Sequence, residues 1–491
     1  MRMNRLFLSC GLFALVMACG SESGSKTKAI PLATSISQKD KEAGAKAHPE
    51  LLQEFGGAYQ GPQSAYVVNV GRKIASQSSL SSVQSDFTVT LLNSSVNNAF
   101  AIPGGYVYIT RQLMALCNDE AEMAGVLGHE VGHVAAMHSQ RRQKAATRNA
   151  IGGTLLQILT QATLGSSGLG GLLQQAVGTG AQLLTLKFSR SQEYEADDLG
   201  IRYLAKGGYD PKALSSMLAS LAAQSALDAR LAGQTKDMPE WASTHPDPAS
   251  RVQRALQRAR DTGSTNTLRN RDAFLSAING VIYGDDPKQG IINGSQFIHP
   301  DIKIAFIAPA GFTMMNGTQA VSVSGSGGQA QFSGGPYSGN LDSYVTSVFR
   351  AFAKNESFTP PSIQHGSVGG MNTAYTTVQA NGQSGPVDVT VIAYELSANQ
   401  AFYFITMTAA GQGFGPFAGM TQSFRRISAQ EAAAVKPRRL AVVSVKAGDT
   451  LATLSGRMAY DDYKMERFLT LNALTASSQL TPGQKVKLVT Y

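Results

Sequence analysis

The segment from Asn118 to Arg142, NDEAEMAGVLGHEVGHVAAMHSQRR, indicates both the fold class and the chemistry of this chain. Asn118 is a capping residue type, acidic residues follow it in the first turn, and apolar residues then recur at helical spacing. Positions four apart lie on one face of a helix, so His129 and His133 can bind one metal ion. Glu130 lies about 100° further round the helix and can reach a water molecule on that ion. The HExxH pattern therefore predicts a helix with two zinc ligands and a general base.

The third zinc ligand is expected from a later segment. The residues after HExxH do not have the HExxHxxGxxH spacing of another class of zinc peptidases. His138 lies five residues after His133 and points away from the ligand face of a continuous helix. We therefore interpret His138 as a non-ligand.

Two carboxylates that stand four apart, Glu193 and Asp197, occur in the helical pattern FSRSQEYEADDLG. We expect Glu193 to complete a His2Glu site with one position open for water. Asp197 is expected to accept a hydrogen bond from a ligand imidazole and so to fix its tautomer. Glu195 faces elsewhere and is interpreted as solvated or as a neighbour of the ligands.

Three motifs in a fixed order resemble one family of zinc peptidases. They are NAFAIPGGYVYIT at 98–110, HEVGH, and EYEAD. Together they resemble the gluzincin family of the CAAX prenyl endopeptidase and HtpX, and within it the soluble periplasmic lipoprotein branch, over about residues 45–260. The resemblance implies a zinc endopeptidase that cleaves misfolded or stalled envelope proteins. It also implies one Zn²⁺ per chain with ligands His129, His133 and Glu193, the base Glu130, and Asp197 as the support of a ligand.

A further segment, STHPDPASRV, contains His245 and Arg251. In the family that the chain resembles, a residue beyond the third ligand approaches the zinc ion or the oxyanion. We therefore predict that His245, or Arg251 together with it, stabilises the tetrahedral intermediate. The alternative is a structural histidine that caps a helix ahead of Pro246.

The upstream motif bends at Pro103, Gly104 and Gly105 between two short runs of strand-forming residues. In gluzincins, a strand beside the metal pairs with an extended substrate. We expect either Asn98–Ile102 or Tyr106–Tyr108 to be that edge and to bind the peptide through main-chain hydrogen bonds.

The N-terminal sequence MRMNRLFLSCGLFALVMAC has arginines ahead of an apolar run that is too short to span a bilayer as a mature helix. Val16–Ala18 before Cys19 resemble a bacterial lipobox. This predicts a signal peptide at 1–18, lipid attachment at Cys19 and a polar tether at 19–47. The residue after Cys19 is Gly20 and not the aspartate that resembles an inner-membrane retention signal. This favours a lipid anchor on the periplasmic side of the bacterial outer membrane. An ordinary secretory signal with an incidental cysteine is the alternative.

Length and composition are consistent with about three folded domains, since the chain has 491 residues of which 43% are apolar. The formal net charge of +9 is spread over short basic clusters, and no nucleic-acid motif accompanies them, so we expect no nucleic-acid partner. Only Cys117 remains after the predicted processing and lipidation, which excludes an intramolecular disulfide in the mature fold.

One internal segment, residues 149–186, contains many glycines and no charged residue. Glutamines interrupt it, and neither half reads as a convincing span. The favoured interpretation is a buried or lid-forming helical hairpin. An element that touches a membrane is the second interpretation, and a true membrane span is the least favoured.

The sequence predicts two modules after the protease domain at 48–262. Residues 263–296 read as a linker. Residues 297–430 alternate short strands with one helix, an α+β pattern that resembles small PsbP-like binding modules. Residues 440–491 are similar to a LysM repeat, a βααβ unit, which implies binding of N-acetylglucosamine-containing glycans such as peptidoglycan. A degenerate module that only caps the chain is the alternative.

The predicted fold class is therefore α+β: a mainly helical zincin metalloprotease domain with a small sheet, then the α+β module and the βααβ unit. The predicted function is that of a zinc endopeptidase of the bacterial cell envelope. The alternative is a non-catalytic, peptidoglycan-bound chaperone or scaffold lipoprotein. The intact ligand set with Glu130 favours the enzyme, because a scaffold does not need a general base.

Overall fold

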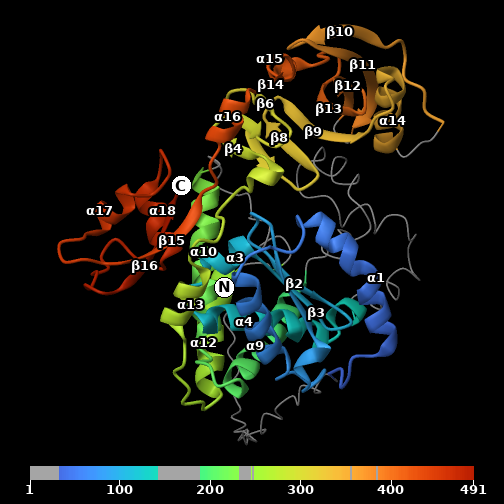
Figure 1. Cartoon of the computed structure of the whole chain (residues 1–491). Helices are drawn as coiled ribbons and strands as arrows, with labels where there is room; N and C mark the ends of the chain where they lie inside the picture. The colour runs from blue at the N-terminus through green and yellow to red at the C-terminus, as the bar shows by residue number, and fades with distance from the viewer. Residues whose placement is uncertain (1–31, 142–187, 232–244, 246–247, 354–356, 383–384) are drawn as a thin grey trace, which may run out of the picture. The chain divides into compact units, whose positions relative to one another are not determined.

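The structure, a computed structural model, describes most of the chain after residue 31 (Figure 1). The predicted signal peptide at 1–18 and the predicted lipid-anchor residue Cys19 lie outside the described residues, as does the uncharged segment at 149–186. Within the described part, no helix has both the length and the apolar character that crossing a membrane requires. The described ranges are 32–141, 188–231, 245, 248–353, 357–382 and 385–491.

Residues 32–47, predicted as part of a polar tether, are folded onto the rest of the protein. Helix α1 (Gln38–Glu54) begins within this stretch. Ahead of that helix, Ala33 donates its backbone N–H to the carbonyl oxygen of Ala135 at 2.7 Å, and Leu32 packs against the main hydrophobic core. The tether prediction is therefore wrong for these residues, because their apolar side chains pack against the main hydrophobic core.

A small three-stranded sheet lies beside the helices of the N-terminal half (Figure 1). Its middle strand, β3, runs parallel to β1 and antiparallel to β2. Gly104 in the β2–β3 turn has φ = 100° and would place a Cβ atom 2.5 Å from the Asp40 carbonyl oxygen, so only glycine fits. The prediction of an edge at Tyr106–Tyr108 is wrong, because β3 pairs on both sides. The strands are β1 (Thr88–Leu92), β2 (Ala99–Ile102) and β3 (Tyr106–Thr110).

The helices of this half bury one large apolar core against the sheet. The mixture of helix and sheet agrees with the predicted α+β class. Residues 263–296, predicted as a linker, contain a short helix whose Phe274, Leu275 and Ile278 are fully buried in that core. The linker prediction is wrong here, because three apolar side chains on one face give the helix a buried side. The helices are α2 (Gln63–Ala75), α3 (Arg111–Leu116), α4 (Glu120–Ala135), α9 (Arg190–Lys206), α10 (Ala213–Leu231), α12 (Pro248–Asp261) and α13 (Arg271–Ile278).

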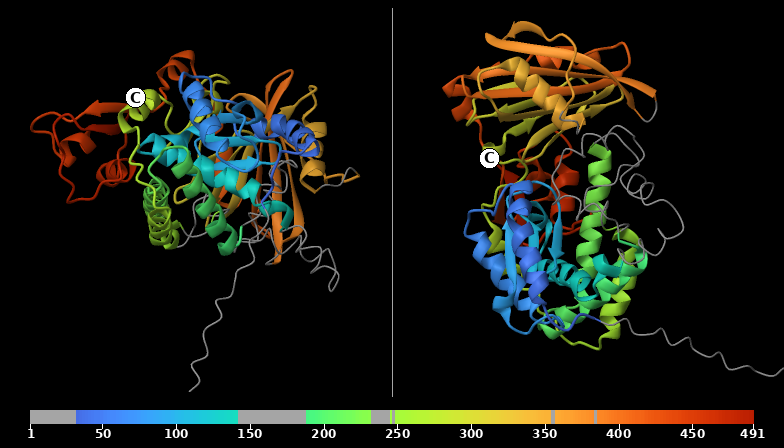
Figure 2. Two further views of the ribbon diagram at one scale, coloured as in Figure 1. Left: turned by 90° about the horizontal axis from the view of Figure 1, so that it is seen from below. Right: turned by 90° about the vertical axis from the view of Figure 1, so that its right-hand side faces the viewer.

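The middle module contains a seven-stranded antiparallel sheet in the order β10-β11-β12-β13-β9-β8-β7. Helix α14 packs on one face of this sheet, and a four-stranded sheet in the order β14-β6-β5-β4 packs on the other, each through a separate apolar core (Figures 1 and 2). These two cores share no residue with the core of the N-terminal half.

The elements of the middle module are β4 (Ile291–Asn293), β5 (Gln296–His299), β6 (Ile304–Ile307), β7 (Thr313–Asn316), β8 (Ala320–Gly325), β9 (Gly328–Pro336), α14 (Leu341–Ala353), β10 (Gln364–Val368), β11 (Met371–Gly382), β12 (Gly385–Ser397), β13 (Gln400–Ala409), α15 (Ala418–Gln422), β14 (Arg425–Arg426) and α16 (Ala429–Ala434).

The chain enters and leaves the middle module at the same place. Tyr283 donates its N–H to the Arg438 carbonyl oxygen at 2.8 Å, and Leu440 donates to that of Val281 at 2.9 Å. The two connecting segments thus run antiparallel, like the stem of a hairpin. The middle module is an insertion at the tip of that stem.

The tail is a βααβ unit, as the sequence predicts. It consists of an antiparallel strand pair and two helices. Thr450 caps the first helix and Asn472 ends the second. The elements are β15 (Arg439–Ser444), α17 (Leu451–Gly456), α18 (Lys464–Leu471) and β16 (Lys485–Thr490).

The tail shares the main core with the N-terminal half. Phe468 and Leu488 belong to the same apolar cluster as Leu113 of α3. Lys487 is fully buried, and its ammonium group donates to three carbonyl oxygens at the end of α3. The acceptors are Ala115 at 2.8 Å, Leu116 at 3.1 Å and Cys117 at 2.7 Å.

Candidate metal centre

Helix α4 carries the HExxH pattern, and its first turn shows why the helix begins where it does. Asp119, not Asn118, is the capping residue, since its carboxylate accepts the N–H of Glu122 at 2.9 Å. The Glu122 carboxylate in turn accepts the N–H of Asn118 at 2.8 Å. The first bond satisfies a donor that a helix start leaves unpaired, and the second holds the residue that precedes the cap. The predicted helix is present, with its cap one residue later than expected.

Glycines bring α4 and α9 close together. A Cβ atom on Gly132 would lie 3.1 Å from the Cβ of Leu199, and one on Gly200 would lie 3.0 Å from the backbone nitrogen of His129. Side chains at these positions would push the helices apart. The close approach brings the carboxylate of Glu193 on α9 to the histidines of α4.

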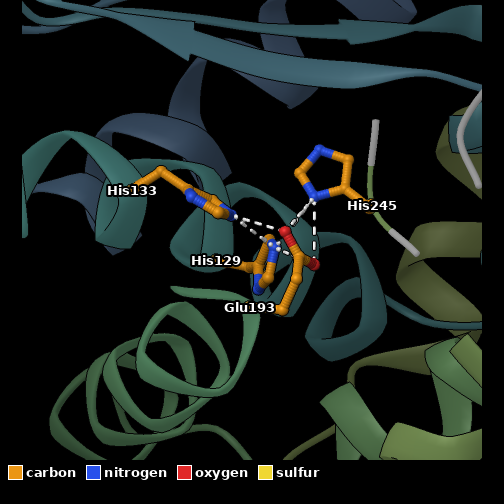
Figure 3. A group of neighbouring side chains, drawn as sticks. All are labelled: His129, His133, Glu193 and His245. Carbon is orange, nitrogen blue, oxygen red and sulfur yellow. Dashed lines mark hydrogen bonds and ion pairs between the residues drawn. The ribbon is translucent and has the colours of Figure 1, made fainter. Parts of the chain in front are cut away.

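Four side chains converge on one point: His129, His133, Glu193 and His245 (Figure 3). All four are buried, and one ligand atom from each lies within 4.8 Å of the others. His133 Nε2 is 3.0 Å from His129 Nε2 and 3.5 Å from Glu193 Oε1. His245 Nδ1 is 3.4 Å from His129 Nε2 and 3.1 Å from Glu193 Oε1.

These separations fit a tetrahedral zinc ion. Zinc binds imidazole nitrogen at about 2.0–2.1 Å, which sets neighbouring donors of a tetrahedron about 3.3 Å apart. Five donor-atom separations within the set are between 3.0 and 3.7 Å, and all the donor atoms lie within 4.8 Å of one another. Burial lowers the pKa of His133 well below its ordinary value, which favours the neutral imidazole that a metal requires. The residues present therefore fit one zinc ion.

Glu130 lies beside this donor set and is 2% exposed. Its Oε1 atom has no hydrogen-bond partner among the described residues, and it lies 3.6 Å from His245 Nε2. Burial raises the pKa of the Glu130 carboxyl above its ordinary value, against the opposing charges of His245 and His129. A buried carboxylate oxygen without a partner is suited to receive a proton from a molecule that enters the site.

Asp197 and Arg251 support the donor set from behind. Asp197 Oδ1 lies 3.0 Å from His129 Nδ1, as expected for a carboxylate that orients a ligand imidazole. Arg251 donates to Asp197 through Nε at 2.9 Å and lies 2.5 Å from Glu193 Oε2 through Nη1. Burial alone would raise the pKa of Asp197, but the charge of Arg251 and the hydrogen bonds from His129 and Arg251 hold that pKa well below its usual range. Arg251 thus binds two carboxylates of the site.

His245 and His138 are the residues whose positions the sequence did not fully indicate. His245 contributes a fourth donor atom to the set, in addition to its proximity to Glu130. His138 is outside the four-donor set but is fully buried, with Nδ1 2.8 Å from His133 Nδ1. This contact depends on the backbone after α4, where Met137 adopts a left-handed conformation with φ = 53° that no glycine in the sequence announces.

Comparisons with known proteins match the same region of the chain to peptidases. The family model described as "Peptidase family M48" matches residues 62–259. The "Beta-barrel assembly-enhancing protease" of Yersinia pestis is 32% identical over 228 residues, which is 45% of this chain and 44% of that protein. The "Mitochondrial metalloendopeptidase OMA1" of Schizosaccharomyces pombe is 30% identical over 212 residues, 42% of this chain and 57% of that protein. The "Metalloprotease YcaL" of Escherichia coli (strain K12) is 36% identical over 166 residues, 33% of this chain and 58% of that protein.

The chain spans about half the length of these curated relatives. The matched region includes both helices that bring the donor atoms together and ends within α12. The resemblance to this group of zinc peptidases is confirmed: residues 62–259 of the chain are a peptidase family M48 domain.

Proposed function

We propose that this chain is a zinc-dependent endopeptidase of the bacterial cell envelope that cleaves misfolded or stalled envelope proteins. The observation that carries the proposal is the buried Oε1 atom of Glu130, which accepts no hydrogen bond from the described residues and lies beside a donor set of zinc geometry. Zinc at this site would polarise the scissile carbonyl and lower the pKa of a water molecule. A non-catalytic scaffold would gain nothing from a buried carboxylate in that position, since its burial is unfavourable.

Each residue near the site has a role in this reaction. Glu130 accepts the proton of the attacking water and returns it to the leaving amine. His129, His133 and Glu193 would hold the metal. The charge of Arg251 keeps Asp197 ionised, and Asp197 fixes the orientation of His129.

The substrate is expected at the free edge of β2 (Ala99–Ile102). This strand pairs with β3 on one side, and no other described strand pairs with its second side. An extended peptide can add to such an edge through backbone hydrogen bonds, which do not depend on its sequence. Unfolded chains expose extended backbone, so this mode of binding suits a protease that acts on misfolded proteins.

His245 gives the site a closed and an open state. A tetrahedral ion takes four donors, and the four side chains here supply that number. Water would take a place on a four-coordinate ion if one of these side chains withdrew. His129, His133 and Glu193 lie on two helices that pack closely, whereas His245 lies outside any helix. We therefore assign the withdrawal to His245, which in the open state is free to stabilise the tetrahedral intermediate beside Glu130.

The cellular setting is part of the proposal. The name of the Yersinia pestis relative, a protease that enhances β-barrel assembly, supports envelope proteins as substrates. A lipid anchor at Cys19 would hold the enzyme on the periplasmic side of the outer membrane. The tail at 440–491 would bind peptidoglycan, in keeping with its βααβ order.

The decisive experiment measures proteolysis of an unfolded protein by the chain without residues 1–19, with zinc content determined in parallel. Glu130→Gln is expected to bind about one zinc ion and to lose activity by at least about 1000-fold, because the general base is gone. Glu42→Gln, the same change at an exposed position of α1, is the control and should leave activity unchanged. A parent protein that binds zinc but cleaves nothing would favour the scaffold, and a parent without zinc would refute the site.

His245→Ala separates the two states of the site. If His245 closes the site, its removal opens a coordination position, and the rate of proteolysis is expected to rise several-fold while zinc is retained. Initial rates at saturating substrate and zinc content are the measurements. A fall in kcat of about 10-fold or more would show that stabilisation of the intermediate outweighs the closing role.

A further inference from the structure

The two histidine ligands of α4 are supported in different ways. His129 Nδ1 faces a carboxylate directly, at 3.0 Å from Asp197 Oδ1. His133 Nδ1 faces a third histidine instead, at 2.8 Å from His138 Nδ1. His138 Nε2 is in turn 3.1 Å from Glu195 Oε2. A ligand imidazole normally donates its second N–H to a carboxylate, carbonyl or water, so the imidazole acceptor at His133 requires an explanation.

The hydrogen bonds determine which ring nitrogen carries the proton in His133 and in His138. His133 presents Nε2 to the donor set, so its proton lies on Nδ1 and is donated to His138 Nδ1. His138 then carries its own proton on Nε2 and donates it to Glu195. Arg141 Nη1 donates to the same carboxylate oxygen at 2.8 Å. Each imidazole N–H in the series has an acceptor, and the charge of Glu195 is balanced by Arg141.

The backbone is arranged to make this contact. α4 ends at Ala135, and Met137 adopts φ = 53°, a left-handed conformation that costs a non-glycine residue of order 1 kcal/mol. On a continuous helix His138 would point away from His133, and the left-handed turn brings it back. Gln192 at the start of α9 donates to the His138 carbonyl oxygen at 3.2 Å and holds the turn. Strain of this kind persists only where surrounding contacts determine it.

We propose that His138 is a positioning residue for the metal site, which through Glu195 fixes the tautomer and orientation of His133. The inference rests on the proposed zinc site. His138 is not itself an alternative ligand, because Nδ1 contacts His133 and Nε2 contacts Glu195. The expected consequence of losing it is weaker metal binding, by about 10- to 100-fold, as for other partners of metal ligands.

The test measures zinc affinity by competition with a chromophoric chelator, in the chain without residues 1–19 and with Glu130→Gln in every variant. Catalysis therefore plays no part in the result. His138→Leu, which removes the acceptor and keeps the bulk, is expected to weaken zinc binding by about 10-fold or more. His138→Asn is expected to bind zinc within about 3-fold of the parent, because its side-chain oxygen occupies the place of Nδ1 and accepts the same proton. His365→Leu, an exposed histidine of β10, is the matched control.

A second readout separates positioning from packing. The visible spectrum of bound Co²⁺ reports ligand geometry and should change in His138→Leu but not in His138→Asn. Equal affinity and spectrum in all variants would overturn the proposal, and so would equal losses in the Leu and Asn variants. If His138→Leu does not fold, Glu195→Ala at the partly exposed end of the series decides the question, with about a 3-fold loss of zinc affinity expected and no loss overturning it. A parent that binds no zinc would refute the proposed function rather than this inference.

Discussion

The middle module and the tail both follow the M48 domain along the chain, yet they relate to it in opposite ways. The middle module has two apolar cores of its own and connects through a hairpin-like stem at Tyr283 and Arg438. The tail has no separate core: its apolar side chains belong to the same cluster as those of α3 and α4. Position in the sequence therefore does not indicate structural dependence, since the tail completes the core of the N-terminal half and the module nearer in sequence is an insertion.

The strongest test of this comparison is removal of the tail. Ending the chain after Pro437 would expose the apolar face of α13 and the end of α3, and it would remove several fully buried side chains. Each such side chain contributes about 1.5–3 kcal/mol, so we expect a loss of more than about 5 kcal/mol in the free energy of unfolding, with loss of zinc binding. Urea denaturation and zinc content measure both. An unchanged denaturation midpoint would show that the tail is an independent domain.

A single residue tests the same contact. Lys487→Met would leave three carbonyl oxygens at the end of α3 without their donor. We expect the free energy of unfolding to fall by about 2 kcal/mol, because buried groups lose a charged partner. Lys485→Met, a partly exposed lysine of the same strand, is the control and should cost less than about 0.5 kcal/mol. A Lys487→Met protein as stable as the control would contradict the role of this contact.

The same lysine predicts a dependence on pH. Burial lowers the pKa of Lys487 to about 7, against the opposing influence of Cys117 and Glu122. The unfolded lysine stays protonated up to about pH 10.5, so between about pH 7 and 10.5 the unfolded state binds more protons and the stability contributed by Lys487 rises with pH. The difference in unfolding free energy between the parent and Lys487→Met should therefore be larger at pH 9 than at pH 6.5. A difference that shrinks on this rise in pH would contradict the lowered pKa.

The smallest effect is expected from the middle module. Replacement of residues 287–434 by a short glycine-serine linker keeps the paired stem and removes two self-contained cores. A few contacts would be lost, such as the hydrogen bond from Thr318 to the Glu54 carbonyl oxygen. We expect a loss of about 1 kcal/mol or less in the stability of the N-terminal half, and zinc affinity within about 2-fold of the parent. Loss of zinc binding in this variant would show that the middle module, like the tail, is needed for the N-terminal half to fold.

The sequence predicted the parts of the site that are close together in a regular helix. His129, Glu130 and His133 follow from spacing alone, and Glu193 with Asp197 follows from a second helix in which positions four apart share a face. The structure brings these side chains together. The predicted start of α4 differs by one residue, because Asp119 caps the helix.

The sequence did not predict contacts that depend on irregular backbone or on long-range packing. His138 was placed away from His133 because a continuous helix was assumed, and the left-handed turn at Met137 is not encoded by a glycine. Burial of Lys487 has no local signal, since lysine is usually exposed and its acceptors lie about 370 positions earlier in the chain. The short pattern of α13 did contain a signal, because Phe274, Leu275 and Ile278 share one face of a helix.

The contact between Lys487 and α3 also sets an order of folding. Lys487 and Ala115 are separated by 372 positions in the sequence, and the core that they share includes the helix next to the metal ligands. A chain that emerges from its N-terminus folds its early segments first, and pairings across such a distance form late. The N-terminal half cannot complete its core until β16 has arrived, so the packing that supports the metal ligands is among the last contacts that the emerging chain forms.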